Sequence, residues 1–314
     1  MSRVVVALGG NALAPGTDPF DAAEHLQVAE IVKTSEFLAE AIADGHDVII
    51  THGNGPQVGN LLAKNEIARD VVPAVSLHWC VAQTQATIGL ELAAALETHL
   101  SALGVERPVL PVLTRVQVDA ADPAFESPSK PIGAWIPSDG PPDRPLPAEH
   151  RWAELRPGLW RRLVPSPQPQ AIIDDAAIEI ALDAGGVVVA CGGGGVPVVA
   201  DGARTRGIEA VIDKDLTAVL LAKLVGADRF VILTDVEGAA VDYGTSEQRF
   251  LGKVDVAEMR RHLADGQFGS GSMKPKVEAA IEFVEATSAI ASIGRLDDAR
   301  AVINGGAGTQ VEMR

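Results

Sequence analysis

One stretch constrains the fold of this chain more than any other, the run from Val48 to Gly59. It opens with apolar, β-branched residues (Val48-Ile49-Ile50) and then turns polar and glycine-rich (Thr51-His52-Gly53-Asn54-Gly55-Pro56-Gln57). The first half predicts a buried strand, and residues 60–69 predict a helix after the turn. A strand, a glycine-rich turn and a helix together present backbone N–H groups to an anion. A tight connection without a ligand is the alternative, although His52, Asn54 and Gln57 supply more polar groups than a turn requires.

Two further apolar runs end in glycines in the same way. Residues 4–8 lead into Gly9-Gly10-Asn11, and residues 187–190 lead through Cys191 into the four glycines at 192–195. In an open parallel sheet, ligands bind at the carboxyl ends of the strands. Three such ends therefore predict an α/β fold with one extended site, suited to a ligand that carries several anionic groups.

Size and composition exclude several classes of protein. The chain has 314 residues, of which 47% are hydrophobic, which predicts one large α/β domain or two lobes with a proper core. Its net charge of −16 argues against nucleic acid or an anionic membrane as a partner. No signal peptide and no membrane-spanning stretch is visible, so we expect a cytoplasmic protein. Cys80 and Cys191 lie in apolar surroundings and are expected to be buried free thiols.

An acidic protein that binds anions must concentrate its few lysines at the binding site. Asp213-Lys214-Asp215 precedes a predicted helix, where each aspartate could orient the ammonium group, cap the helix or hold a cation such as Mg²⁺. A capping aspartate beside a surface lysine is the alternative. Lys274 and Lys276 come from a loop at 266–275 and precede a helix predicted over 277–285, so they would add to the positive end of that helix.

Residues 118–168 differ in composition from the rest of the chain. They are rich in proline and carry Trp135, Trp152 and Trp160. A long proline-rich segment within a domain is usually a functional flap or a disordered linker, and the tryptophans favour a segment with some packing of its own. Lys130 lies on a predicted turn within it, with a solvated surface lysine as the alternative.

The flanking segments are less informative. A helix predicted over 79–103 carries Gln83, Thr84, Gln85 and Thr87 near its start, and this cluster favours a side that faces solvent. A strand is predicted over 109–113, and the segment after residue 289 is expected to close the edge of the sheet. The phosphate-loop, dinucleotide-binding, zinc-protease and serine-hydrolase motifs do not occur in the sequence.

Seven motifs follow one another over nearly the whole chain. They are Val5-Val6-Ala7-Leu8-Gly9-Gly10-Asn11-Ala12, residues 52–60, Lys130-Pro131-Ile132-Gly133, Val164-Pro165-Ser166-Pro167, residues 191–198, residues 210–215 and Gly271-Ser272-Met273-Lys274-Pro275-Lys276. In this order they resemble the motifs of carbamate kinase, a member of the amino acid kinase superfamily. Any one glycine motif is weak, but seven in series are specific. The Lys-Pro-Ile-Gly motif and the Ile-Asp-Lys-Asp motif separate this family from its relatives.

The resemblance implies a fold and an activity. The fold would be the three-layer amino acid kinase fold, an open, mostly parallel sheet between helix layers with a small protruding subdomain. An N-terminal lobe, about 1–168 with the protruding flap at about 118–168, would bind carbamate or carbamoyl phosphate. A C-terminal lobe, about 169–314, would bind ATP or ADP with Mg²⁺. Such enzymes are usually homodimers and interconvert ATP and carbamate with ADP and carbamoyl phosphate, often at the end of arginine deimination.

The resemblance also implies roles for particular residues. Carbamate is already an anion, so its oxygen can attack without a general base, and transfer needs positioning and charge neutralisation. Lys214 and Lys276 would contact the phosphates, Lys130 would reach the acceptor from the flap, and Asp213 and Asp215 would hold Lys214 and assist with Mg²⁺. No metal ligand is assigned with certainty. The predicted acceptor-binding residues are Gly9, Gly10, Asn11, His52, Gly53 and Asn54. The predicted nucleotide-binding residues are Gly193, Gly194, Thr234, Asp235, Val236, Tyr243 and Met273.

The chain departs from the family pattern near the acceptor lobe. Residues 77–80 read Leu-His-Trp-Cys without the usual acidic residue, residues 86–89 read Ala-Thr-Ile-Gly, and Gly133-Ala134-Trp135 stands where Gly-Pro-Phe is typical. These departures leave open a related kinase that acts on another small carboxylate or phosphate. A non-catalytic sensor of nucleotide or carbamoyl phosphate is the third hypothesis. The presence of all three lysines argues against a sensor.

Overall fold

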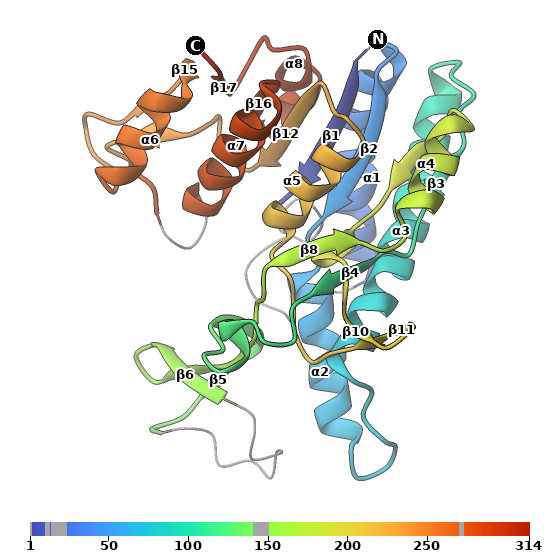
Figure 1. Cartoon of the computed structure of the whole chain (residues 1–314), viewed down its shortest axis with the longest axis vertical. Helices are drawn as coiled ribbons and strands as arrows, with labels where there is room; N and C mark the ends of the chain where they lie inside the picture. The colour runs from blue at the N-terminus through green and yellow to red at the C-terminus, as the bar shows by residue number, and fades with distance from the viewer. Residues whose placement is uncertain (1, 10–12, 14–23, 141–150, 270–272) are drawn as a thin grey trace.

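The computed structural model describes residues 2–9, 13, 24–140, 151–269 and 273–314. Its centre is an eight-stranded sheet in the order β15-β17-β16-β12-β1-β2-β9-β3 (Figure 1). Neighbouring strands in this sheet are parallel, except that β16 and β17 are antiparallel. The strands are β1 (Arg3–Leu8), β2 (Asp47–His52), β3 (Val109–Pro111), β9 (Val187–Val189), β12 (Arg229–Thr234), β15 (Lys253–Asp255), β16 (Ile290–Arg295) and β17 (Thr309–Glu312).

The central strands are continuous apolar runs because both faces of the sheet are covered. Side chains that alternate along β1 enter two separate cores, with Val5 and Ala7 on one face and Val4 and Val6 on the other. The first core is closed by α4 (Asp175–Asp183), α5 (Lys214–Leu224), α6 (Val256–Ala264) and α7 (Met273–Thr287). The second is closed by α1 (Glu24–Ala43), α3 (Leu77–Ala102) and α8 (Ala299–Ile303). The predicted three-layer α/β fold is therefore confirmed.

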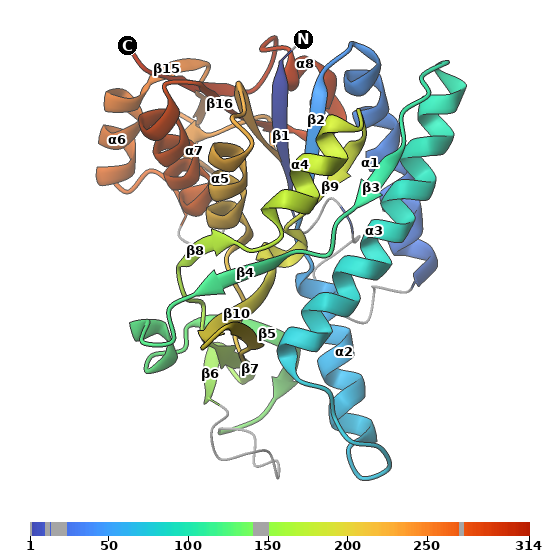
Figure 2. The ribbon, with the colours of Figure 1, turned by 45° about the vertical axis from the view of Figure 1, so that its right-hand side comes forward.

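Two smaller sheets and one helix extend below the central sheet. Figure 2 shows β8, β4 and β10 crossing under it, with β5, β6 and β7 below them. One sheet has the order β11-β10-β4-β8 and the other β5-β7-β6. The elements are β4 (Arg115–Val118), β5 (Lys130–Pro137), β6 (Arg151–Arg156), β7 (Leu159–Val164), β8 (Pro169–Ile172), β10 (Val196–Asp201), β11 (Arg204–Gly207) and α2 (Gly55–Ala68). The proline-rich segment thus contains a small sheet of its own, which we call the flap (β5, β6 and β7).

Several predicted boundaries were wrong. Helix α2 begins at Gly55, ahead of the predicted residues 60–69, and Pro56 lies in its first turn, where its missing N–H costs nothing. Helix α7 begins at Met273, so its lysines lie in the helix and not in a loop before it. Strand β3 ends at Pro111. Strand β17 does not close the sheet edge, since it lies between β15 and β16 and the edge strand is β15.

Three further expectations concern the cysteines, membrane-spanning helices and the division into lobes. Cys80 and Cys191 are free and buried, as predicted, and burial raises the pKa of both thiols. No helix in the described part of the chain is both long and apolar enough to cross a membrane. The division into lobes near residue 168 stays a prediction. The central sheet itself takes strands from both halves of the chain.

Candidate active site

One cavity of about 980 Å³ opens where the central strands end. Gly9 follows β1, Gly53 follows β2 and Thr234 ends β12, and all three line the cavity. The first residues of α2, α5 and α7 line it too. Backbone N–H groups at the start of a helix have no partner within the helix and carry partial positive charge. Three helix starts and three strand ends at one cavity give it the backbone donors and the partial positive charge that suit an anion.

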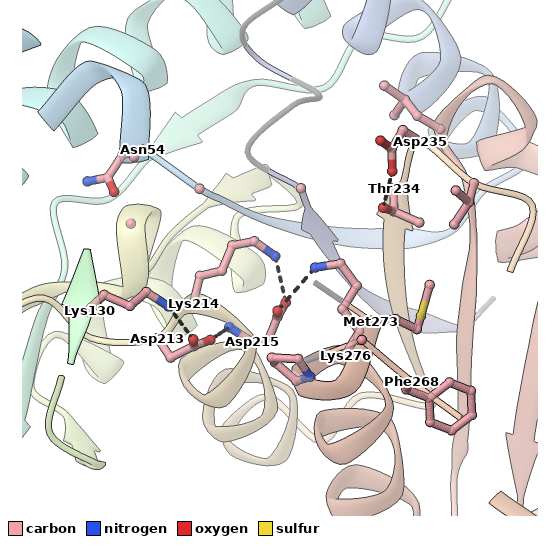
Figure 3. Close-up of a pocket in the computed structure, with 18 of the residues that line it drawn as sticks. Asn54, Lys130, Asp213, Lys214, Asp215, Thr234, Asp235, Phe268, Met273 and Lys276 are labelled. Carbon is pink, nitrogen blue, oxygen red and sulfur yellow. Dashed lines mark hydrogen bonds and ion pairs between the residues drawn. The ribbon is translucent and has the colours of Figure 1, made fainter. Parts of the chain in front are cut away.

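Two lysines share one buried carboxylate in this cavity. Lys214 Nζ lies 2.6 Å from one oxygen of Asp215, and Lys276 Nζ lies 3.3 Å from the other (Figure 3). Asp215 is 5% exposed. Burial opposes its ionised form, but the two ammonium groups outweigh burial and lower the pKa of Asp215 to about 2. Burial and the nearby Lys214 lower the pKa of Lys276. The trio carries a net positive charge that is partly hidden from water.

A third lysine reaches the same place from the flap. Lys130, the first residue of β5, donates to Asp213 over 2.7 Å, so it is not a free surface lysine. The other oxygen of Asp213 caps α5 by accepting from the N–H of Asp215 at 2.9 Å. The prediction that Asp213 holds Lys214 is therefore wrong. One oxygen of Asp213 accepts from the helix start and the other accepts from Lys130 of the flap. Lys214 pairs with Asp215 instead.

The glycine turn after β9 forms the back wall of the cavity. Gly193 lines the cavity with a left-handed φ of 64°, and a Cβ there would overlap the Asn54 amide. A Cβ at Gly192 would overlap the ring of His52, and one at Gly194 would overlap the carbonyl of Ile212. This close packing explains why the turn consists of glycines.

His52 and Gly194, both predicted to bind ligands, are buried and do not line the cavity. The His52 ring is buried and its Nδ1 donates to the Gly53 carbonyl at 2.9 Å. Burial lowers the pKa of His52 to about 4, so the ring is neutral at pH 7. Gly53 and Asn54 line the cavity, whereas Gly10 and Asn11 lie outside the described residues.

Sequence reasoning missed a polar layer behind the wall. The Asn54 amide donates to the Thr84 hydroxyl at 2.9 Å. The Gln85 amide donates to the carbonyls of Thr114 and Gly192 and accepts from the Thr114 N–H. Thr84 and Gln85 are buried, so the prediction of a solvent-facing side is wrong for them, whereas Gln83 and Thr87 are exposed as expected. A signal existed, because they lie between Val81 and Ile88 on the apolar stripe of the helix.

The opposite end of the cavity is more apolar. Thr234, Asp235, Val236, Tyr243 and Met273 all line it, as do Gln267 and Phe268, which the sequence did not single out. Figure 3 shows Met273 and Phe268 close together, on the side of the lysines away from Lys130. The cavity therefore has an apolar end, a cationic centre and an end under the flap.

Comparison with known proteins decides the family. Residues 2–291 match the model of the amino acid kinase family. The chain belongs to this family. It is 43% identical to a carbamate kinase of Thermococcus kodakarensis over 99% of both chains. It is also 43% identical to carbamate kinase 1 of Enterococcus faecium, over 90% of this chain and 89% of that one. A solved structure of carbamate kinase from Giardia lamblia bound to AMP-PNP is similar with a TM-score of 0.89, at 32% identity, covering 100% of this chain and 99% of that one.

The amino acid kinase site has the parts that phosphoryl transfer requires. Such a reaction needs little covalent help from the protein and depends on positioning and on neutralising charge at the moving phosphoryl group. Lys130, Lys214 and Lys276 place three positive charges at the cavity, and the helix starts place backbone N–H groups there. Within the described residues, no group of three or more histidine, cysteine, aspartate and glutamate side chains could hold a metal ion.

Proposed function

We propose that the protein is a carbamate kinase, which transfers a phosphoryl group reversibly between ATP and carbamate. The observation that carries this proposal is the convergence of Lys130, Lys214 and Lys276 on two carboxylates in one cavity. The high identity to carbamate kinases over the full chain supports it. A phosphotransferase of this family with these three cations has the equipment for a small anionic acceptor.

The cavity suggests where each substrate binds. The nucleotide base would occupy the apolar end near Tyr243 and Met273, and its phosphates would point to Lys214 and Lys276. Carbamate would bind under the flap, between Lys130 and the strand ends at Gly9, Gly53 and Asn54. The phosphoryl group would then move between the two lysines of the cationic centre, where the starts of α5 and α7 also face it.

In the forward reaction, a carbamate oxygen forms a bond to the γ-phosphorus while the bond from that phosphorus to the ADP oxygen breaks. Carbamate carries its own negative charge, so the reaction requires no general base. The structure fits a reaction without a general base, because the buried His52 is neutral and does not line the cavity. Lys214 and Lys276 neutralise charge on the transferring group, and Asp215 keeps both ammonium groups in position.

We also propose that Mg²⁺ takes part, carried by the nucleotide. Asp213 and Asp215 have the oxygen ligands that Mg²⁺ prefers, but each carboxylate already accepts from a lysine. A Mg²⁺ ion held mainly by phosphate oxygens and water fits such a donor set better than a cage of protein ligands. When bound, the ion would neutralise charge on the nucleotide phosphates.

The test is ATP formation from ADP and carbamoyl phosphate with Mg²⁺, read by a coupled assay. We expect turnover by the wild type and a loss on the order of 10²-fold or more in Lys214→Ala, because a preorganised charge at the transfer point is removed. Lys274→Ala is the matched control. Lys274 lies on the same helix start as Lys276, but it pairs with Glu278 at 3.8 Å and does not line the cavity. Near-normal turnover of Lys214→Ala would contradict the assignment.

The departures from the family pattern favour testing other acceptors as well. His78 packs against Gly207, and its Nδ1 lies 3.9 Å from Glu209, away from the cavity. Trp135 lies in the flap itself. Absence of turnover with carbamoyl phosphate, in a folded protein that binds ADP, would favour a kinase for another small carboxylate or phosphate. Binding without turnover of any such acceptor would favour a sensor.

A homodimer, a cytoplasmic location and a place at the end of arginine deimination belong to the same proposal. Trp79 and Leu90 support a dimer, since both are large, exposed and on the same face of α3. We expect light scattering to give twice the chain mass of 32.7 kDa, and Leu90→Lys to weaken the association. A monomer at all concentrations would contradict this part of the proposal.

A further inference from the structure

The flap carries a second cation that faces the cavity, Arg161 on β7. The other cations at this end and at the centre are paired, Lys130 with Asp213 and Lys214 and Lys276 with Asp215. Arg161 is different, because no carboxylate in the described part of the chain lies within ion-pair distance of it. Its Nε is buried and has no hydrogen-bond partner. A half-buried guanidinium without an anion costs free energy of folding unless a ligand supplies the missing charge and hydrogen bonds.

An aromatic ring holds this guanidinium in place. Arg161 lies over the ring of Trp135, 5.2 Å from its centre, and Arg156 lies over the same ring at 4.6 Å. Trp135 comes from β5, the strand that carries Lys130 and pairs directly with β7. Burial, together with the neighbouring Arg156, lowers the pKa of Arg161, which indicates a charge that lacks compensation inside the protein.

A bulge in β5 sets the position of Trp135. The β5–β7 register shifts between Ile132 and Ile136, and Gly133 within that interval has a left-handed φ of 73°. Bulges re-aim side chains and are common near binding sites. The bulge lies on the body of the protein, since a Cβ at Gly59 of α2 would sit 3.4 Å from the Gly133 Cα. The Trp135–Arg161 contact is therefore anchored at the place where the flap meets α2.

We propose that Arg161 binds the acceptor-side anion under the flap, carbamate or carbamoyl phosphate, and that Trp135 positions its guanidinium. This inference rests on the proposed function. A planar guanidinium offers parallel N–H donors that match the two oxygens of a carboxylate-like group or of a phosphate, whereas a lysine is a point charge. Tryptophan holds a cation better than phenylalanine does. The tryptophan at 135, which departs from the family pattern, thus has a purpose at the acceptor end.

The test compares two arginines that share one ring. Arg161→Gln removes the cation that lines the cavity, and Arg156→Gln is the matched control, since Arg156 contacts Trp135 but does not line the cavity. For Arg161→Gln we expect the KM of carbamoyl phosphate to rise about 10- to 100-fold, the range for a lost charged hydrogen bond, with the KM of ADP changed less than about two-fold. Arg156→Gln should leave both constants within about two-fold. Trp135→Leu should raise the KM of carbamoyl phosphate by a smaller factor than Arg161→Gln does.

Arg161→Lys separates charge from geometry. It keeps a cation and the fold but lacks the planar pair of donors, so the KM of carbamoyl phosphate should still rise, by less than in Arg161→Gln. Unchanged kinetics in Arg161→Lys and Arg161→Gln, equal changes for both substrates, or an equal effect of Arg156→Gln would overturn the proposal. If the wild type shows no turnover, the proposed function fails. Calorimetric binding of carbamoyl phosphate to wild type and Arg161→Gln then still decides whether Arg161 holds the anion.

Discussion

At the scale of single residues, the site depends on one carboxylate that serves two cations. Asp215 is nearly buried, and its two oxygens contact Lys214 and Lys276 separately. Burying such charges costs free energy that their attraction only partly returns, so this trio contributes little to stability. What it supplies is position, because two ammonium groups that would repel each other are fixed on one side of a cavity. The overall charge of −16 makes this local concentration of cations more notable.

His52 gives a prediction about stability and pH. Its folded pKa of about 4 lies below the ordinary value of 6.5, so the unfolded chain binds a proton more readily. The stability that neutral His52 contributes is present above pH 6.5 and is lost as the pH falls toward 4. We expect His52→Asn, which keeps a donor for the Gly53 carbonyl, to reduce the loss of unfolding free energy between pH 7 and pH 4 by roughly 3 kcal/mol.

Urea unfolding at pH 7, 5.5 and 4 measures this difference. His25→Asn is the control, because His25 is an exposed histidine on α1. The control should show the same pH dependence as the wild type. The same slope in wild type and His52→Asn would mean that His52 takes up its proton equally well in the folded and unfolded chain.

At the scale of elements, the glycine turn after β9 connects the polar layer to the cavity. A glycine can be required by its backbone conformation or by close packing, and two glycines of the chain distinguish these reasons. Gly193 and Gly202 both have a left-handed φ, 64° and 59°. A Cβ at Gly193 would overlap the Asn54 amide, whereas one at Gly202 would meet open space. We expect Gly202→Ala to lower the unfolding free energy by about 1 kcal/mol with full activity. Gly193→Ala should lose several times as much stability, or displace Asn54 and lower kcat/KM at least about ten-fold.

Thermal unfolding and steady-state kinetics of the two variants, measured side by side, give the comparison. Equal losses in Gly193→Ala and Gly202→Ala would show that the backbone conformation alone explains the glycine at 193, with no role for its contact with Asn54.

The sequence predicted the elements whose signal is local. The buried strands before Gly9, Gly53 and the glycines at 192–195 follow from continuous apolar runs, and their common edge follows from parallel pairing. The pairing of Lys130 with Asp213 did not follow, because the two residues are 83 positions apart and only the flap brings them together. Gln85 was misread for a similar reason, since its partner in the glycine turn is 107 positions away. A polar residue on a helix looks the same in sequence whether it meets water or a distant backbone group.

At the scale of the whole molecule, the two halves of the chain are interleaved in one sheet. Strand β9 comes from the second half and lies between β2 and β3 of the first. Strand β1 of the first half pairs with β12 of the second along five residue pairs. Both cores use these strands, so neither half has a complete hydrophobic core. The predicted lobes can therefore be binding regions without being units that fold alone.

Separate expression of residues 1–168 and 169–314 tests this interleaving. We expect neither fragment to show a cooperative thermal transition, because 1–168 exposes the β1 edge that faced β12, and 169–314 leaves β9 without both of its neighbours. The matched control is the intact chain with a protease site at the exposed Gln168, cut after folding. The same two pieces should then stay associated and bind ADP, since the sheet formed before the cut. If either fragment alone unfolded cooperatively near the midpoint of the intact chain, the halves would be independent domains, and the site between them would depend on their docking rather than on one continuous sheet.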